Sequence, residues 1–428
     1  MIRAWRSFWH RSWAPILFGA VFASLMVSFA MMGRETGLNL WANLVSGLSE
    51  STVITGPLAA GVCAWEAARW KGPAAARLVV ASRPIWQIRL RHAAESSGPI
   101  VLAFPAALLV LAGYGVATGT YGAPFVPWLL ALWACLILAA SFGYAVGIVL
   151  GSRWYTAPLA VLSFFGLYVG IQSWNLPFGV RSLFPVITNL DTEFVRYIPA
   201  TMWGQIALFG ALSLLLLILA NPVRGGRRTG TMVACTAAAA AAFAGGAVVI
   251  STNGQYVTGY NSRDFVCEGT APDICLNRGY AEAYPQLAQR FALLNEKVAG
   301  TSLVATRLEQ NIEGIGDAPA AGARSVYLEE VNDEGMDFSV FRYVNKYGDG
   351  PTCWSEDEPA YDQYLAGMLV DLWLTEYDAY GFAEYDELTP GYAELQRMQQ
   401  LSVEEGNAWL RQHERAYLDC TLTLSDLP

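Results

Sequence analysis

The chain has 428 residues, of which 54% are hydrophobic and 15% are charged, and its mean hydropathy is +0.32. In soluble proteins about a quarter of the residues are charged, so this composition argues against an ordinary soluble enzyme. The net charge of -9 is unevenly divided: residues 1–250 hold 16 Lys and Arg against 6 Asp and Glu, and residues 251–428 hold 11 against 30. A second half this acidic would repel phosphates, so we expect no nucleic-acid partner.

Residues 1–13 are amphipathic. At about 100° of rotation per residue, Ile2 and the aromatic side chains fall on one arc of a helix, while Arg3 and Arg11 fall on the other. This pattern predicts an interfacial helix that binds membrane lipids in the inner headgroup layer. A positive flank with ordinary aromatic anchors is the alternative.

Seven stretches of near 20 residues are almost free of charge, which is the length that a helix needs to cross roughly 30 Å of hydrocarbon. We therefore predict a polytopic α-helical membrane protein. The stretches are Ala14 to Met32, Trp41 to Trp65, Pro99 to Ala117, Phe125 to Leu150, Ala157 to Trp174, Thr201 to Ala220 and Thr231 to Ile250.

The cations in the loops orient these spans, because Lys and Arg near span ends stay on the cytoplasmic side. With the N-terminus inside, the inner segments hold 13 Lys and Arg, and the outer segments hold 3, namely Arg34, Arg181 and Arg196. We expect a cytoplasmic N-terminus, seven crossings and an extracellular C-terminus. A cleaved signal peptide, ending near Ser28 to Ala30, is the alternative for the first span.

Two loops are unusual. The inner loop, residues 66–98, is long and basic, and its segment Pro84 to Arg91 can form a helix that contacts something inside the cell. A solvated basic loop is the alternative, but it leaves the embedded Trp86, Ile88 and Leu90 unexplained. The outer segment, residues 175–200, is too apolar for a free loop, and it suggests two short helices that dip back into the outer leaflet, broken between Pro185 and Asp191.

Glu50 is a charge inside the second predicted span, about two turns from its start. An uncompensated charge there costs on the order of 3 kcal/mol, so Glu50 is a candidate for the membrane pathway or for a pairing site between helices. Alternatively, the span begins later and Glu50 lies at the outer interface.

Together, residues 1–13, the six spans of residues 14–220, the inner loop and the apolar outer segment resemble the ABC type-2 exporter permease family. The resemblance implies an interface helix, a six-span core, a cytoplasmic coupling helix within residues 66–98 and re-entrant helices within residues 175–200. The seventh span, residues 231–250, and the domain after it depart from the minimal pattern of this family.

The energy source must lie in another chain if the resemblance holds. The sequence contains no G-x-x-x-x-G-K-[ST] phosphate loop, so we expect no cofactor on this chain and ATP-Mg on a partner. The implied partners are a dimer of ABC ATPase subunits and a second permease, either a copy of this chain or a homologue. Arg83, Trp86 and Arg89 are the candidate contacts with the ATPase.

Four cysteines fall in residues 251–428: Cys267, Cys275, Cys353 and Cys420. An even number in an extracellular domain predicts disulfides, and four cysteines allow three connectivities. We favour Cys267 with Cys275 and Cys353 with Cys420. A four-cysteine metal site is the alternative, although the C-x-x-C spacing is missing, and we expect no metal.

The same domain is predicted to be mixed α+β, with one core. Helical spacing marks Leu287 to Val298, Tyr361 to Trp373 and a last helix that Ser402 and Glu405 begin with a capping box. Segments Ser325 to Val331 and Asp337 to Val344 are expected to be strands. Catalytic residues are scarce: His413 is the only histidine here, and the acidic runs Glu356 to Glu358 and Asp386 to Glu387 are more typical of solvated surfaces than of calcium or acid–base sites.

The sequence thus favours a permease subunit that exports a lipid, peptide or drug-like substrate, is not an enzyme by itself, and carries a domain that gates or receives the substrate. A membrane-anchored receptor or immunity protein that works without an ATPase is the alternative, and an ectoenzyme is the third. The usage of Ala and Arg, with three lysines in the chain, is typical of a high-GC bacterium, so we expect the bacterial plasma membrane.

Overall fold

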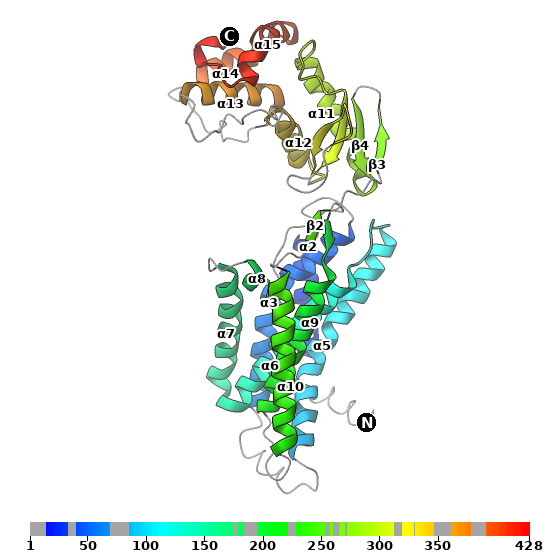
Figure 1. Cartoon of the computed structure of the whole chain (residues 1–428), viewed down its shortest axis with the longest axis vertical. Helices are drawn as coiled ribbons and strands as arrows, with labels where there is room; N and C mark the ends of the chain where they lie inside the picture. The colour runs from blue at the N-terminus through cyan, green and yellow to red at the C-terminus, as the bar shows by residue number, and fades with distance from the viewer. Residues whose placement is uncertain are drawn as a thin grey trace. The chain divides into compact units, whose positions relative to one another are not determined.

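The computed structural model describes residues 14–32, 40–68, 85–173, 178–183, 195–220, 228–252, 257–259, 265–269, 272–311, 319–328, 330–345, 361–377 and 391–428. Contacts divide the chain into two compact units, whose boundary lies between Thr258 and Gly259 (Figure 1). The predicted interfacial helix, residues 1–13, lies outside the described residues. Each unit is described by itself below.

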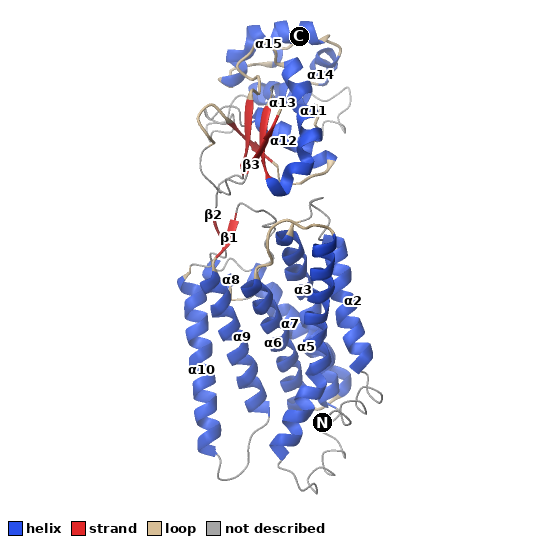
Figure 2. Ribbon diagram, turned by 90° about the vertical axis from the view of Figure 1, so that its right-hand side faces the viewer, coloured by secondary structure: helices blue, strands red, loops and turns tan. Residues whose placement is uncertain are grey.

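The first unit is a bundle of helices (Figure 2). Each predicted span coincides with a helix, although the bounds shift by several residues. The helices are α2 (Ala14–Met32), α3 (Trp41–Ala68), α5 (Ile85–Ala117), α6 (Val126–Leu150), α7 (Arg153–Ser173), α9 (Pro199–Ala220) and α10 (Arg228–Ser251), with the four-residue α8 (Phe178–Arg181) before α9.

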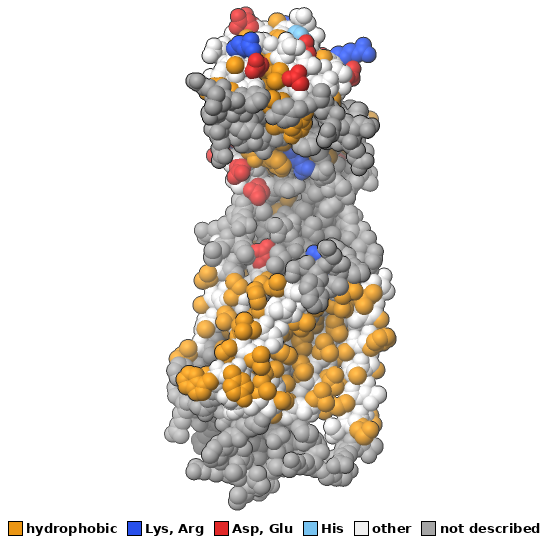
Figure 3. Space-filling model, turned by 90° about the vertical axis from the view of Figure 1, so that its left-hand side faces the viewer, with side chains coloured by type: hydrophobic (Ala, Val, Ile, Leu, Met, Phe, Trp, Pro, Cys, Tyr) orange, Lys and Arg blue, Asp and Glu red, His pale blue; other side chains and the backbone are white. Residues whose placement is uncertain are grey.

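The surface of this bundle is apolar. In the described part of the chain, five helical segments are long and apolar enough to cross a membrane, and they lie in α5, α6, α7, α9 and α10. Large apolar side chains point outward from them, such as Val116 (81% exposed) and Phe243 (81% exposed). Figure 3 shows this apolar surface over the first unit, while charged side chains gather mainly on the second. These features indicate an α-helical protein embedded in a membrane.

Helix α5 differs from the prediction of a separate coupling helix followed by a span at Pro99. The helix begins at Ile85 and runs through Pro99 and Pro105 to Ala117. An interior proline removes its own N–H donor and crowds the carbonyl four residues before it, so it can kink a helix without ending it. The i,i+4 ion pair between Arg91 and Glu95 (2.7 Å) supports the turns before Pro99. The inner loop therefore continues directly into the third span.

The outer segment also differs from the prediction. Its first short helix is present as α8, but the described part of the expected second helix is strand β1 (Val195–Tyr197), which pairs with β2 (Val257–Gly259). β-Branched and aromatic residues favour a strand, and pairing with β2 satisfies backbone groups that a free loop would expose. Beside this ladder the Thr201 and Thr252 hydroxyls, from α9 and α10, are hydrogen-bonded (3.0 Å).

Helix α3 packs against α2, α5, α6 and α7, and its closest contact is with α6. A Cβ added to Gly143 of α6 would lie 1.9 Å from the carbonyl oxygen of Ala60, and one added to Gly147 would lie 2.4 Å from that of Ala64. Small residues spaced four apart on both helices thus bring the two backbones together, a common way to join helices in membranes.

The second unit is built on a four-stranded sheet of order β3-β4-β5-β6. The strands are β3 (Phe265–Glu268), β4 (Asp273–Asn277), β5 (Arg307–Asn311) and β6 (Arg324–Tyr327). β3 is antiparallel to β4, and the other two pairs are parallel. Ile274, Leu308 and Val326 are fully buried on the face that packs against helices, so the core lies on that side.

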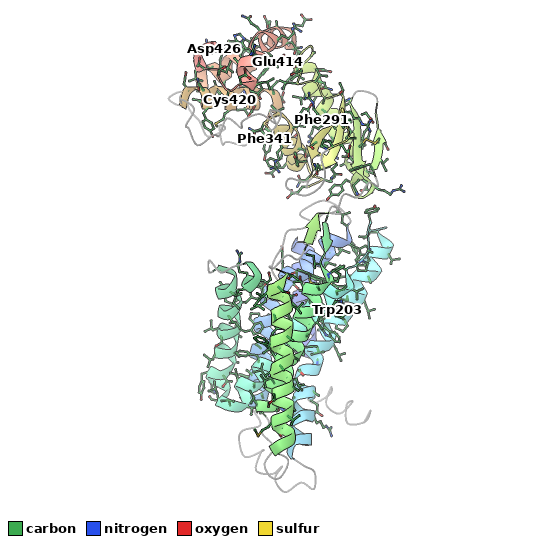
Figure 4. The ribbon with its side chains drawn as sticks, viewed as in Figure 1. Trp203, Phe291, Phe341, Glu414, Cys420 and Asp426 are labelled. Atoms are coloured by element: carbon green, nitrogen blue, oxygen red, sulfur yellow. A yellow bond between two sulfur atoms is a disulfide. The ribbon has the colours of Figure 1, made fainter. Side chains whose placement is uncertain are left out.

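The helices of this unit are α11 (Tyr284–Lys297), α12 (Asp333–Asn345), α13 (Tyr361–Thr375), α14 (Tyr392–Gln399) and α15 (Val403–Leu418). The three predicted helices are present as α11, α13 and α15, and the capping box of Ser402 and Glu405 is formed. Phe291 of α11 (Figure 4) is fully buried and meets Tyr343 edge-on, with ring centroids 5.2 Å apart.

The prediction of a strand over Asp337 to Val344 was wrong, because this segment lies in α12. The side chain of Asn332 accepts a hydrogen bond from the Gly335 N–H (2.6 Å), and two acidic residues occupy the first turn, which stabilises a helix N-terminus. Met336, Val340 and Val344 are buried at a spacing of four, which fits a helix against the sheet.

The C-terminal helices meet at a buried carboxylate. Asp371 of α13, 5% exposed, accepts hydrogen bonds from the hydroxyl of Tyr417 on α15 and from the side-chain amide of Asn345 on α12. Lys297, at the end of α11, donates to the backbone carbonyl of Trp373 (2.9 Å). Asp371 therefore joins α12, α13 and α15, and Lys297 ties α11 to the end of α13 by a separate contact.

We predict that Gly143→Ala lowers the thermal stability of the detergent-solubilised protein, because the new methyl group overlaps the Ala60 carbonyl and forces α3 and α6 apart. Overpacking of this kind costs about 1–3 kcal/mol. Gly113→Ala on α5 is the matched control, since nothing lies within 4 Å of its added Cβ. Equal melting temperatures for the two variants would show that the α3–α6 contact has room for a methyl group at Gly143.

We predict that Tyr417→Phe destabilises the second unit by about 1–3 kcal/mol, because the buried Asp371 carboxylate loses a hydrogen-bond donor. Thermal unfolding of the full chain measures the loss. Tyr392→Phe, at a half-buried position on α14, is the control and should change little. A loss of similar size in both variants would contradict a special role for the Asp371 contact.

Candidate functional site

A run of polar residues occupies the first half of α3. We call Ser49, Glu50, Ser51, Thr52 and Thr55 the polar segment. Although α3 packs against four other helices, it is not among the five apolar segments found in the described chain. Polar residues on a central membrane helix are costly unless they are satisfied or used, so this segment is the candidate site.

The hydroxyl groups of the polar segment bond to their own helix. Ser51 donates to the Leu48 carbonyl (2.6 Å), Thr52 to that of Ser49 (2.6 Å) and Thr55 to that of Ser51 (2.8 Å). This back-bonding satisfies the hydroxyls inside the bundle without a second helix. The three side chains are at most 4% exposed, so they form a buried polar layer behind Glu50.

Tyr168 of α7 completes the site. Its ring is 2% exposed, it shares a side-chain hydrogen bond with Thr52, and it interacts electrostatically with Glu50. Two glycines of α3 allow α7 to come this close: a Cβ added to Gly56 would lie 3.0 Å from the Phe164 ring, and one added to Gly61 would lie 2.4 Å from Val161. The glycines thus place the tyrosine beside the polar segment.

Glu50 lies in the third turn of α3, because the helix begins at Trp41. It is half-buried, whereas Ser49 and Ser51 on either side are 1% exposed. Ile54 and Leu58, which follow at i+4 and i+8, are 56% and 43% exposed. Glu50 therefore belongs to the face of α3 that points out of this bundle.

The predicted ATPase contacts are only partly described. Arg83 lies outside the described residues, and Trp86 and Arg89 fall on the first turns of α5, where the backbone alone is described. Both residues lie at the start of α5, at the opposite end of that helix from Ala117. Their role stays a prediction.

The predicted disulfide between Cys267 and Cys275 is present, and it joins directly opposed positions of β3 and β4. Cys420, after α15 (Figure 4), is also disulfide-bonded, while Cys353 lies outside the described residues. Asp273 lies close to the first pair, but the two sulfurs are bonded to each other and do not form a metal site with it.

The second unit holds its one histidine in a structural contact. His413 stacks on Trp409 at 5.0 Å, and its Nδ1 lies 2.9 Å from the Trp409 carbonyl. Glu414 beside it accepts a hydrogen bond from the backbone of Ser302 (2.5 Å). The acidic runs Glu356 to Glu358 and Asp386 to Glu387 lie outside the described residues.

Sequence reasoning singled out Glu50 but missed Tyr168 and the hydroxyl layer of Thr52 and Thr55. The run Ser49 to Thr52 could have indicated the hydroxyl layer, because four consecutive polar residues are unusual within a span. Tyr168 gave no such signal, since an aromatic residue near a span end is common.

No protein-family model matches the chain, and comparison with curated proteins and with solved structures found no match.

We predict that Cys267→Ser lowers the stability of the second unit by about 2–3 kcal/mol, the chain-entropy value for a loop this short. Peptide mapping of the unreduced protein should recover the peptide that joins Cys267 and Cys275, and unfolding measures the loss. Cys235→Ser, on α10, is the control because Cys235 is a free cysteine. Recovery of the two cysteines in separate peptides would contradict the pairing.

Proposed function

We propose that this chain is the membrane subunit of an ABC exporter. It moves a lipid, peptide or drug-like substrate outward, with ATP hydrolysed by a partner subunit. The observation that carries the proposal is the polar segment of α3, which presents Glu50 on an outward face of a membrane helix. Ionisable residues within membrane helices usually face a pathway or another helix and not lipid, which favours a second surface over this face.

A second permease copy is the partner that closes this face. Facing α3 helices of two subunits then enclose a pathway with carboxylates and apolar residues on its walls. The side-chain layout of α3 supports this arrangement, because its other sides are occupied by α2, α5, α6 and α7.

The order of elements also supports the proposal. In the described residues, six long helices from α2 to α9 precede the additional α10, and the short α8 stands between α7 and α9, where the family has re-entrant helices. The sequence holds no phosphate loop, so the ATPase acts in trans. The distribution of Lys and Arg supports a cytoplasmic N-terminus and an extracellular second unit.

The second unit would then gate the pathway or receive the substrate outside. Its disulfide suits an oxidising compartment, and its excess of acidic residues keeps it soluble there. This self-contained α+β unit is also what a membrane-anchored receptor or immunity protein would use, and that function is the alternative.

We predict that an ABC ATPase subunit co-purifies with the tagged full chain in a mild detergent. The triple variant Arg83→Ala, Trp86→Ala, Arg89→Ala should lose it, because these residues supply the coupling contact. Mass spectrometry of the eluate and ATP hydrolysis by the complex measure the result.

The control is the triple variant Arg224→Ala, Arg227→Ala, Arg228→Ala, which removes three cations from a different inner segment, one more than the coupling variant removes. It should retain the ATPase. Retention in both triple variants would move the docking contact elsewhere but leave the exporter in place. Absence of any ATPase from the unaltered chain would overturn the proposal and favour the receptor or immunity protein.

A further inference from the structure

The outward face of α3 combines one charged residue with apolar residues. Glu50 begins it, and Ile54 and Leu58 follow on the same side over the next two turns, both more than two-fifths exposed. At a rise of 1.5 Å per residue, the strip from Glu50 to Leu58 is about 12 Å long. One carboxylate therefore stands at the end of an apolar strip.

Aromatic residues mark the two ends of the helix. Trp41 begins α3 and donates its backbone N–H to the Tyr121 carbonyl (3.1 Å), while Trp65 near the other end meets Trp154 edge-on, with ring centroids 6.0 Å apart. Tryptophan and tyrosine concentrate at membrane interfaces. Nine residues separate Glu50 from Trp41, which places the carboxylate about 14 Å below that end.

The chemistry of this strip selects a ligand class. Calcium and magnesium ions need six or more oxygen ligands, and one carboxylate does not supply them. An anionic ligand would be repelled. A molecule with one positive charge and an apolar body matches both parts of the strip, because its charge meets Glu50 and its body covers Ile54 and Leu58.

The neighbours of Glu50 suit this role. Tyr168 and Thr52 form a hydrogen-bonded pair on the bundle side, so the carboxylate has a polar backing.

We propose that Glu50 binds the positive charge of a lipophilic cation, and that such cations are the substrates of the pathway. The inference rests on the proposed function for its transport step, but the binding step belongs to this chain alone.

The test measures binding of radiolabelled tetraphenylphosphonium to the purified full chain in lipid nanodiscs by equilibrium dialysis. Tetraphenylborate, of the same shape and opposite charge, is the matched ligand control. Glu50→Gln should weaken phosphonium binding at least tenfold without strengthening borate binding by a similar factor. Glu66→Gln, which removes the other half-buried carboxylate of α3, should bind phosphonium like the unaltered chain.

Glu50→Asp keeps the negative charge and should retain phosphonium binding. It replaces Glu50→Gln as the test variant if Glu50→Gln fails to fold. Three results would overturn the proposal: no saturable phosphonium binding by the unaltered chain, equal binding by Glu50→Gln, or a loss of phosphonium and borate binding alike. Dialysis needs no ATPase, so the two proposals can fail separately. Glu50-dependent binding without a co-purifying ATPase would contradict the exporter and support the cation site. A co-purifying ATPase without Glu50-dependent binding would contradict the cation site alone.

Discussion

The close approach of α3 and α6 is the contact on which the membrane unit depends. Gly143 and Gly147 of α6 leave room for the backbone of α3 at Ala60 and Ala64. Without side chains between them, the two helices gain many weak backbone contacts, which is the main source of helix association when lipid is as apolar as the protein interior. Helices α2, α5 and α7 also pack on α3, so this pair lies at the centre of the described bundle.

The candidate site inherits its geometry from that arrangement. With one side of α3 held by α6, Gly56 and Gly61 are turned toward α7, and they let Phe164 and Val161 come into contact. Tyr168, one turn further along α7, then reaches Thr52. The only face of α3 left open in the described bundle carries Ile54 and Leu58, and Glu50 stands on it.

The second unit is stabilised by different means. Its sheet is covered by helices on one side, a disulfide ties β3 to β4, and a buried aspartate, Asp371, gathers three helices through Tyr417 and Asn345. A buried carboxylate is expensive unless donors surround it, so these partners fix the packing of α12, α13 and α15 with greater specificity than apolar contacts alone. Glu414 of α15 also links two segments, because it accepts a hydrogen bond from the Ser302 backbone, whereas His413 contacts Trp409 within its own helix.

The sequence by itself indicated a helical membrane protein, located the long helices of the first unit to within several residues, favoured the pairing of Cys267 with Cys275 among three connectivities, and singled out Glu50. These conclusions rest on local hydropathy and residue spacing, which act within one element. It misjudged Asp337 to Val344, because its polar and apolar residues fit a strand almost as well as a helix, and the Asn332 cap decided the matter. Only the tertiary structure decided that α5 is continuous from Ile85, that Val195–Tyr197 pairs with β2, and that Tyr168 backs Glu50 on an outward face. These features depend on which sides of two distant segments meet, and that choice is made by packing at glycines and alanines whose local pattern does not name a partner.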